Sequence, residues 1–432
     1  MTTALQTLQQ VFGYASFRDP QDTIIHHVTN GGHALVLMPT GGGKSLCYQI
    51  PALLRPGLTL VISPLIALMQ DQVGALQRHG IPAACLNSTQ GAAASQALQR
   101  QIGEGRLKLL YVSPERLSQP GFLALLQQWQ RDIGLGLFAI DEAHCIAEWG
   151  HDFRPEYRQL CLLHQHFPQV PRIALTATAD PQTREEIISQ LRLQEGRQFI
   201  SSFDRKNLGY CIHPKDNPWA QITSFLQHRH PHHSGILYCQ SRRQVESMAQ
   251  WLQHQGWPAV PYHAGLSMSL REAHQSGFLA SSCTIMVATI AFGMGVDKPD
   301  VRFVIHLQSP KNLESYYQET GRAGRDGMPA EALLLFHRDD LAAQQSRLDH
   351  GHRSRERKDI EQRRLDALGA FCLSTGCRRQ ALLGYFGEAH SGYCGQCDRC
   401  NPAFQHWSGP RRRHHAVTFA PDHFTPAYRR TR

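Results

Sequence analysis

Short apolar runs alternate with longer, helix-compatible stretches along the first half of the chain. Most of the runs are followed by Ser, Thr, Asp or Gly, as expected where a strand ends in a loop. Continuous apolar runs of this kind are typical of strands that are buried on both faces of a parallel sheet. The sequence therefore predicts an α/β domain with a parallel sheet. The expected strands are Ala34–Leu37, Leu58–Ile62, Leu107–Val112, Leu137–Ile140 and Ile173–Leu175.

A polar segment, Ser201–Asn207, precedes a second set of apolar runs, which predicts a second parallel-sheet domain. After Phe336 the pattern changes to charged helical sequence such as Arg353–Lys358, followed by a group of cysteines. We expect domains at 1–204 and 205–340, a small helical module at 341–402, and a basic, disordered tail at 403–432. The second set of strands is expected at Gly235–Cys239, Thr284–Ala288, Val301–Ile305 and Leu333–Phe336.

The first run leads into Met38-Pro-Thr-Gly-Gly-Gly-Lys-Ser45, which precedes a helix-compatible segment. Glycines let successive backbone N–H groups turn toward one anion, and the helix N-terminus adds partial positive charge. Lysine can reach the β- and γ-phosphates, and serine can ligate magnesium. This order of strand, loop and helix predicts a nucleoside triphosphate site, although Met38 replaces the first glycine of the usual pattern and a plain glycine-rich turn is the alternative. The expected binding residues are Thr40, Gly41, Gly43, Lys44 and Ser45.

A second acidic motif, Asp141-Glu-Ala-His144, directly follows the apolar run that ends at Ile140. The carboxyl end of a parallel strand faces the same edge of the sheet as the phosphate loop. We therefore expect Asp141 to hold magnesium, Glu142 to polarise the attacking water, and His144 to link the site to the rest of the motor. Nucleotide hydrolysis is the leading hypothesis.

Only the first domain carries a phosphate loop, so the second is expected to complete the site from across a cleft. The segment Gln318–Gly327 contains Arg322 and Arg325 among small residues. A guanidinium group is planar and permanently charged, so it suits charge that develops on a transferred phosphoryl group. We predict Arg325 as the arginine finger with Arg322 beside it; a surface salt-bridge loop is the alternative.

Composition narrows the class of protein further. The chain has no apolar run long enough to span a membrane and no signal-like start, which predicts an intracellular protein, cytoplasmic or nuclear. Twelve cysteines in 432 residues are too few for a disulfide scaffold, so most should be free thiols. The net charge of +9 favours a polyanionic partner, although six arginines and Asp422 place +5 of this charge in 405–432.

Four cysteines near the end of the charged helical region, Cys377, Cys394, Cys397 and Cys400, have the spacing C-x16-C-x2-C-x2-C. Two residues between cysteines let adjacent thiolates turn onto one tetrahedral ion. Four thiolates leave no open position, so the pattern predicts a structural zinc site that fixes 395–399 to the preceding helices. An iron–sulfur cluster would use the same ligands and remains the alternative. Cys372 lies among apolar neighbours and is expected in the core.

In this order and spacing, these motifs resemble the RecQ family of superfamily 2 DNA helicases over 8–400. The segment 147–157 resembles the aromatic-rich loop of that family. Trp149 and Phe153 offer ring faces to unstacked bases, and the resemblance also assigns His151 and Arg154 to DNA binding. The segment 12–21 resembles the nucleotide-reading motif of the family, so Tyr14, Arg18 and Gln21 are expected to bind ATP, although Asp19-Pro20 replaces the usual Pro-Gly.

Other segments match helicase motifs by resemblance, and most are expected to line a groove for single-stranded DNA. They are 63–72, 86–89, 113–117 and 176–178 in the first domain, and 238–242, 262–266 and 288–299 in the second.

The resemblance implies two RecA-like domains, zinc in the helical module, and a helicase that uses ATP and magnesium to move 3′ to 5′. Its expected partners are single-stranded and tailed duplex DNA and repair proteins such as single-strand-binding protein, and the protein is expected to act as a monomer in DNA repair and recombination. The chain resembles a family form that stops after the zinc module, without the winged-helix and further domains. A non-unwinding translocase or DNA-binding fragment is therefore an alternative. An RNA-directed helicase is a second alternative, which the aromatic-rich segment and the cysteine module disfavour.

Overall fold

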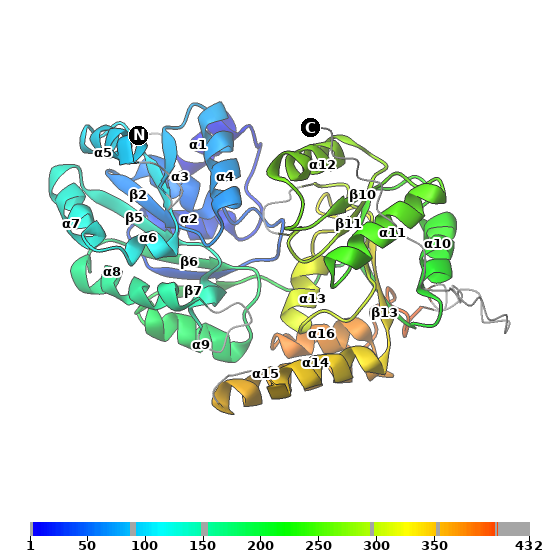
Figure 1. Ribbon diagram of the computed structural model, residues 1–432. Helices are drawn as coiled ribbons and strands as arrows, with labels where there is room; N and C mark the ends of the chain where they lie inside the picture. Colours follow the sequence, from blue (N-terminus) through cyan, green and yellow to red (C-terminus); the bar gives the residue numbers. More distant parts are fainter. Residues whose placement is uncertain are drawn as a thin grey trace, which may run out of the picture.

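The computed structural model describes residues 3–86, 92–147, 154–293, 298–350, 355–401 and 404. Figure 1 shows two α/β domains side by side, with three further helices next to the second domain. This arrangement confirms the predicted fold class of two parallel-sheet domains followed by a helical module. Residues 405–432 of the expected tail lie outside the described part of the chain.

The first domain is built on a parallel sheet whose strand order is β3-β4-β2-β5-β6-β1-β7. Alternate residues of β1 belong to different apolar clusters: Leu35 and Leu37 pack on one face of the sheet, and Ala34 and Val36 on the other. Helices therefore cover both faces, as continuous apolar strands require. The strands are β1 (Ala34–Leu37), β2 (Leu58–Ile62), β3 (Ala83–Leu86), β4 (Leu109–Val112), β5 (Leu135–Ile140), β6 (Arg172–Thr176) and β7 (Arg197–Ile200).

The helices of this domain are α1 (Ala4–Phe12), α2 (Gln21–Thr29), α3 (Leu46–Leu54), α4 (Ile66–Arg78), α5 (Ala92–Gly103), α6 (Pro114–Leu117), α7 (Phe122–Asp132), α8 (Cys161–His166) and α9 (Pro181–Gln190), with 3₁₀ helices η1 (Ala143–Ile146) and η2 (Pro155–Leu160).

The second domain has a parallel sheet with strand order β10-β11-β9-β12-β13-β8. Its strands are β8 (Leu208–Pro214), β9 (Gly235–Tyr238), β10 (Ala259–Tyr262), β11 (Ile285–Ala288), β12 (Phe303–His306) and β13 (Ala330–Phe336). Its helices are α10 (Pro218–Arg229), α11 (Arg242–His254), α12 (Met268–Ala280) and α13 (Leu313–Thr320).

The helical module consists of α14 (Arg338–His350), α15 (Arg355–Leu373) and α16 (Arg378–Tyr385). It contacts both domains: on α15, Arg364 lies 3.0 Å from Glu314 of the second domain and 3.6 Å from Asp180 of the first. Arg184 of the first domain also donates to the carbonyl oxygen of Phe386 over 2.7 Å. Figure 1 shows α15 reaching from the second domain toward α9 of the first.

The strands that apolar runs predicted are the inner strands of the two sheets, while β3, β7, β8 and β10 were not predicted. These four are the outermost strands of the two sheets. An edge strand has a neighbour on one side only and need not be apolar throughout, so its sequence signal is weak. In β7, for example, only Phe199 is buried. No helix in the described part of the chain is both long and apolar enough to cross a membrane.

Candidate functional site

The glycine-rich segment forms a loop between β1 and the start of α3, as predicted. Gly41 and Gly43 have φ values of +81° and +78°, in the left-handed region that favours glycine. The Lys44 ammonium group lies 3.2 Å from the Met38 carbonyl oxygen and 3.4 Å from that of Pro39, so it is held across the loop. Burial lowers the pKa of Lys44, while Glu142 and Asp141 act in the opposite direction. The loop therefore places one lysine and two carboxylates in a single site.

The nucleotide-reading segment lies directly against this loop. The buried Gln21 side chain donates to the carbonyl oxygens of Gly42 at 3.2 Å and Gly43 at 3.1 Å, and it accepts from the Arg18 backbone N–H at 2.9 Å. The Arg18 guanidinium donates to the Gly41 carbonyl oxygen at 2.9 Å. Two of the three residues expected to read adenine thus also hold the phosphate loop. Tyr14 is 55% exposed, which leaves its ring open for stacking.

Asp141 and Glu142 follow the carboxyl end of β5 beside the loop. The Asp141 backbone N–H donates to the Ile62 carbonyl oxygen at 2.8 Å, and Tyr157 donates to the Asp141 carbonyl oxygen at 3.0 Å, which fixes the turn. Burial, and after it the charge of Glu142, raises the pKa of Asp141 to about 7, while Lys44 acts in the opposite direction. Glu142 has a φ of +48°, a conformation that costs a non-glycine residue about 1–3 kcal/mol and that clusters at functional sites.

A series of hydrogen bonds leads from Glu142 to the second domain. His144 Nδ1 lies 3.3 Å from a Glu142 carboxylate oxygen and 2.9 Å from the Thr176 hydroxyl. The Thr176 hydroxyl donates to the Thr178 carbonyl oxygen at 3.1 Å, so its oxygen is left to accept from His144. Gln318 on α13 then donates to the Thr178 hydroxyl at 2.8 Å. Burial favours the protonated form of Glu142. The hydrogen bond and charge of His144 outweigh this effect, so the pKa of Glu142 is lowered.

Both predicted arginines of the second domain lie at the first domain's site. A Cβ atom built on Gly41 would lie only 3.0 Å from Arg325 Cγ, so Arg325 packs directly on the phosphate loop. Arg322 is 8% exposed, and its charge helps to lower the pKa of Glu142. The structure therefore brings Lys44, Glu142 and both arginines together from two domains.

Sequence reasoning missed Arg205, which lies in the linker between β7 and β8 and contacts this same site. Its guanidinium donates to carbonyl oxygens of the phosphate loop and of the loop that carries Arg322 and Arg325. The only signal in the sequence is a cation in a polar segment, which usually marks a solvated surface. Thr178 lies within a matched motif and Gln318 begins the predicted arginine segment, but no pattern indicated that they bind one another.

Of the expected DNA-binding residues, Trp149, His151 and Phe153 lie outside the described residues. Arg154 is described: its guanidinium donates to the Pro64 carbonyl oxygen at 3.0 Å and lies 3.8 Å from a Glu115 carboxylate oxygen. Arg154 thus joins the end of the aromatic-rich segment to two other predicted groove motifs.

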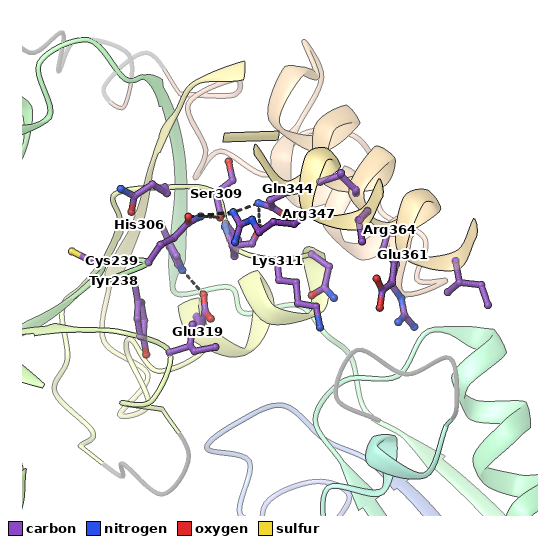
Figure 2. A pocket seen from close by; sticks show the side chains of 18 of the residues that line it. Tyr238, Cys239, His306, Ser309, Lys311, Glu319, Gln344, Arg347, Glu361 and Arg364 are labelled. Carbon is purple, nitrogen blue, oxygen red and sulfur yellow. Dashed lines mark hydrogen bonds and ion pairs between the residues drawn. The ribbon is translucent and has the colours of Figure 1, made fainter. Parts of the chain in front are cut away.

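A cavity of about 330 Å³ lies between the carboxyl end of the second sheet and helices α14 and α15 (Figure 2). Tyr238, Cys239 and Gln240 of a predicted groove motif line it. Figure 2 shows Lys311 and Arg364 on the side of this cavity that faces the first domain. The cavity is therefore lined by amide, aromatic and cationic groups and also by the carboxylates of Glu319 and Glu361.

The four predicted cysteines meet at the end of the helical module. One sulfur from each of Cys377, Cys394, Cys397 and Cys400 lies within 4.8 Å of the others, and Cys372 is not part of this group. That spacing fits four thiolates around one tetrahedral ion. Every cysteine of the chain is free of disulfides, as expected.

The cysteine segment is joined to α16 and also, unexpectedly, to the second sheet. Arg378 is fully buried and makes two hydrogen bonds of 2.9 and 3.0 Å to Asp398, which fixes the segment to α16 as predicted. In addition, the Tyr210 N–H on β8 donates to the Gln396 carbonyl oxygen at 3.1 Å, and the Asp398 N–H donates to the Tyr210 carbonyl oxygen at 3.0 Å. The segment thus covers the edge of the sheet at β8.

Phe404 lies one residue inside the expected tail and packs on this edge. The Arg229 guanidinium lies 5.1 Å from the centre of the Phe404 ring, and the Cys211 sulfur lies 3.7 Å from the Phe404 carbonyl oxygen. Contact with the second domain therefore extends beyond the cysteines.

Comparison with known proteins agrees with this architecture. Residues 18–187 match the family model of DEAD/DEAH box helicases, and 217–327 match the helicase conserved C-terminal domain. The solved structure of Mycobacterium smegmatis helicase Lhr bound to ssDNA and AMP-PNP shares the fold, with a TM-score of 0.57 and 24% identity, over 81% of this chain and 50% of that one. The fold and the phosphate loop thus define the class of the protein: a helicase core of two RecA-like domains.

The particular family follows from the module and from the relatives. Residues 338–401 match the RecQ zinc-binding family model. The ATP-dependent DNA helicase RecQ of Haemophilus influenzae is 50% identical over 398 residues, which is 92% of this chain and 63% of that protein. The Pasteurella multocida protein of the same name is 49% identical, over 92% of this chain and 62% of that protein. The chain belongs to the RecQ family, and it spans about three fifths of the length of these relatives.

Proposed function

We propose that this protein is an ATP- and magnesium-dependent DNA helicase that moves 3′ to 5′ along single-stranded DNA and separates duplexes during repair and recombination. The observation that carries the proposal is the position of Arg325, which belongs to the second domain and packs on the phosphate loop of the first. An ATP site shared by two domains makes hydrolysis depend on their relative position, which is what a translocating motor requires. Family membership supports DNA as the track, and the 3′-to-5′ polarity rests on the family resemblance alone.

At the ATP site, each residue has a proposed role. Tyr14, Arg18 and Gln21 bind the base, while the phosphate loop from Thr40 to Ser45 binds the phosphates. Ser45 and Asp141 would hold magnesium, which neutralises phosphate charge when it is bound. The two side chains suit this ion chemically because a serine hydroxyl and a buried carboxylate are oxygen donors of the kind it prefers.

Glu142 orients and activates the attacking water, and its low pKa keeps it able to accept a proton. Lys44, Arg322 and Arg325 stabilise the charge that develops on the transferred phosphoryl group. His144 connects Glu142 to Thr176 and, through Thr178, to Gln318 of the second domain. Domain position can thereby affect the orientation of the catalytic carboxylate.

We propose that single-stranded DNA crosses both domains along the cleft, where Trp149, His151, Phe153 and Arg154 contact it. The cavity of Figure 2 extends this path over the second domain. Lys311, which is exposed at the cavity, supplies a cation of the kind that a phosphate backbone requires. The proposed partners are therefore single-stranded and tailed duplex DNA, with single-strand-binding protein as a candidate protein partner.

The cysteine group is proposed to hold one structural zinc ion, with all four thiolates as ligands. The proposed domain limits are 1–204, 205–340 and 341–402, and the proposed tail is 403–432. We also propose that the protein acts as a monomer in the compartment that contains the DNA, which is the cytoplasm in a bacterium or the nucleus in a eukaryote.

The first test is ATP hydrolysis with and without single-stranded DNA in the parent protein, Lys44→Ala and Trp149→Ala. We expect strong stimulation by DNA in the parent, no hydrolysis in Lys44→Ala, and hydrolysis that DNA no longer stimulates in Trp149→Ala. Strand separation is then measured on duplexes with a 3′ or a 5′ tail, and only the 3′-tailed duplex should be unwound. DNA binding without stimulated hydrolysis would instead identify a DNA-binding fragment, and hydrolysis without strand separation a translocase.

A further inference from the structure

Arg205 in the linker between the two domains binds the backbone on both sides of the ATP site. From its two terminal nitrogens it donates to the carbonyl oxygens of Thr40 at 3.4 Å, Gly321 at 3.1 Å, Ala323 at 2.8 Å and Gly324 at 2.9 Å. Guanidinium is a planar group with five donors, so one side chain can hold several carbonyl oxygens in fixed relative positions. One linker residue therefore contacts both domains at the interface where ATP is expected.

Three of the carbonyl oxygens that Arg205 binds belong to residues directly next to the two arginines of the proposed catalytic site. Gly321 and Ala323 flank Arg322, and Gly324 directly precedes Arg325. Thr40 immediately precedes Gly41, on which Arg325 packs. The position of both cationic side chains relative to the phosphate loop thus depends on the backbone that Arg205 binds.

The backbone of Arg205 is in turn held by α16 of the helical module. Arg379 on α16 donates to the Arg205 carbonyl oxygen at 2.9 Å and to the Leu208 carbonyl oxygen at 2.7 Å, and it pairs with the Asp204 carboxylate. Arg379 lies two residues after the proposed zinc ligand Cys377. The backbone of Arg205 is therefore held by α16, and its side chain is held by the backbone around the ATP site.

We propose that Arg205 is a positioning residue for ATP hydrolysis: it sets the loop of Arg322 and Arg325 against the phosphate loop, and Arg379 fixes it in place. Arg205 need not touch the nucleotide, because its hydrogen bonds go to carbonyl oxygens. The proposal rests on the proposed ATPase function. It adds that the linker controls the geometry of the catalytic arginines, and that the helical module acts on this geometry through the linker.

The test compares DNA-stimulated ATP hydrolysis in the parent, Arg205→Ala, Arg205→Lys and the adjacent, exposed Lys206→Ala as a matched control. Misplacement of catalytic groups by about 1 Å can cost about a hundred-fold in rate, so we expect kcat to fall at least about ten-fold in Arg205→Ala. KM for ATP should stay within about two-fold, because the hydrogen bond from Arg205 to the phosphate loop, 3.4 Å to Thr40, is the longest of its four. Arg205→Lys should recover part of kcat, since an ammonium group can bind some of the same carbonyl oxygens, and Lys206→Ala should match the parent.

Hydrogen exchange measured without nucleotide separates this proposal from the ATPase function itself. The backbone N–H groups of Ala323, Gly324 and Asp326 are hydrogen-bonded in the structure and should exchange slowly in the parent. In Arg205→Ala we expect faster exchange confined to 321–327, whether or not the protein hydrolyses ATP. Unchanged exchange in this segment, faster exchange throughout the first domain, or a kcat within about two-fold of the parent would each overturn the positioning role. A parent without ATPase activity would refute only the proposed function, and the exchange result would still decide the role of Arg205.

Discussion

The Gln318 side-chain amide donates to the Thr178 hydroxyl over 2.8 Å, and this bond joins residues 140 positions apart in the two domains. Thr178 is fully buried and follows β6, while Gln318 belongs to α13, the helix that leads into the loop of Arg322 and Arg325. Through Thr176 and His144, the same series of bonds reaches Glu142. The proposed catalytic carboxylate and the second domain are thus connected through side chains and through the backbone of Thr178.

Removing this bond should weaken the coupling between DNA and hydrolysis. Thr178→Val keeps the size of the side chain but cannot accept from Gln318, so we expect DNA to stimulate ATP hydrolysis less, by about five-fold or more, for a lost interaction of about 1 kcal/mol. Stimulation is measured as the ratio of kcat with and without single-stranded DNA. Thr223→Val, in which the lost hydroxyl bonds only within α10, is the control and should keep the parent ratio. A Thr178→Val protein with the parent ratio would show that the bond is structural.

Removal of the metal should selectively unfold the segment that carries the four cysteines. The parent is expected to contain one zinc ion per chain, and a strong chelator should lower the melting temperature because structural zinc sites contribute directly to folding. Cys397→Ser replaces a fully buried ligand and should lose the metal. Cys372→Ser replaces a buried cysteine outside the group and should keep it. Elemental analysis distinguishes zinc from iron, and finding iron would favour the iron–sulfur alternative.

The stability of the protein should be sensitive to substitution of either partner in the ion pair between Arg378 and Asp398. Arg378 is fully buried and Asp398 is 5% exposed, so removal of Asp398 leaves the buried Arg378 charge without its counter-ion. Removal of Arg378 leaves Asp398 with the partly exposed Arg399, 3.7 Å away. Arg378→Met or Asp398→Leu alone should destabilise the protein by about 3–5 kcal/mol in urea unfolding. The double variant should cost clearly less than the sum of the two, because neither charge is then left alone. Additive losses would show that the pair contributes little.

Acid should destabilise the first domain partly through His33. Burial, and after it the charges of Arg172, His164 and His27, lowers the pKa of His33 from 6.5 to about 4. A histidine whose pKa is lower in the folded state stabilises the fold above pH 6.5, and this stability is lost as the pH falls from 6.5 toward 4. His33 Nδ1 accepts from the Arg172 N–H at 3.1 Å, and His33→Asn can keep an acceptor there without titrating.

His33→Asn should therefore lose less melting temperature between pH 7.5 and pH 5 than the parent, measured by calorimetry. His254→Asn, at an exposed position on α11, is the control and should follow the parent. An equal loss in His33→Asn and the parent would mean that other groups account for the acid sensitivity.

The local motifs were predictable because their residues are neighbours in the sequence. The phosphate loop lies between a strand and a helix, and the acidic pair at Asp141 and Glu142 lies at a strand end, so local order alone places each at the same edge of the sheet. The cysteines could be grouped because their spacing is set by the geometry of a tetrahedral ion. Inner strands were also evident, because burial on both faces requires continuous apolar sequence.

The sequence by itself therefore determined the class of fold, the order of the domains and the residues that can carry the chemistry. Only the tertiary structure decided how these parts bind one another: Gln318 on Thr178, Arg205 on Gly321 across 116 positions, and the cysteine segment on the edge strand β8. The first two contacts join polar side chains to a distant hydroxyl or backbone group, and the third joins backbone to backbone. None of them leaves a periodic pattern, because either partner alone looks like an ordinary polar segment. A hydrogen bond between distant residues exists only once folding has fixed both partners within about 3 Å of each other.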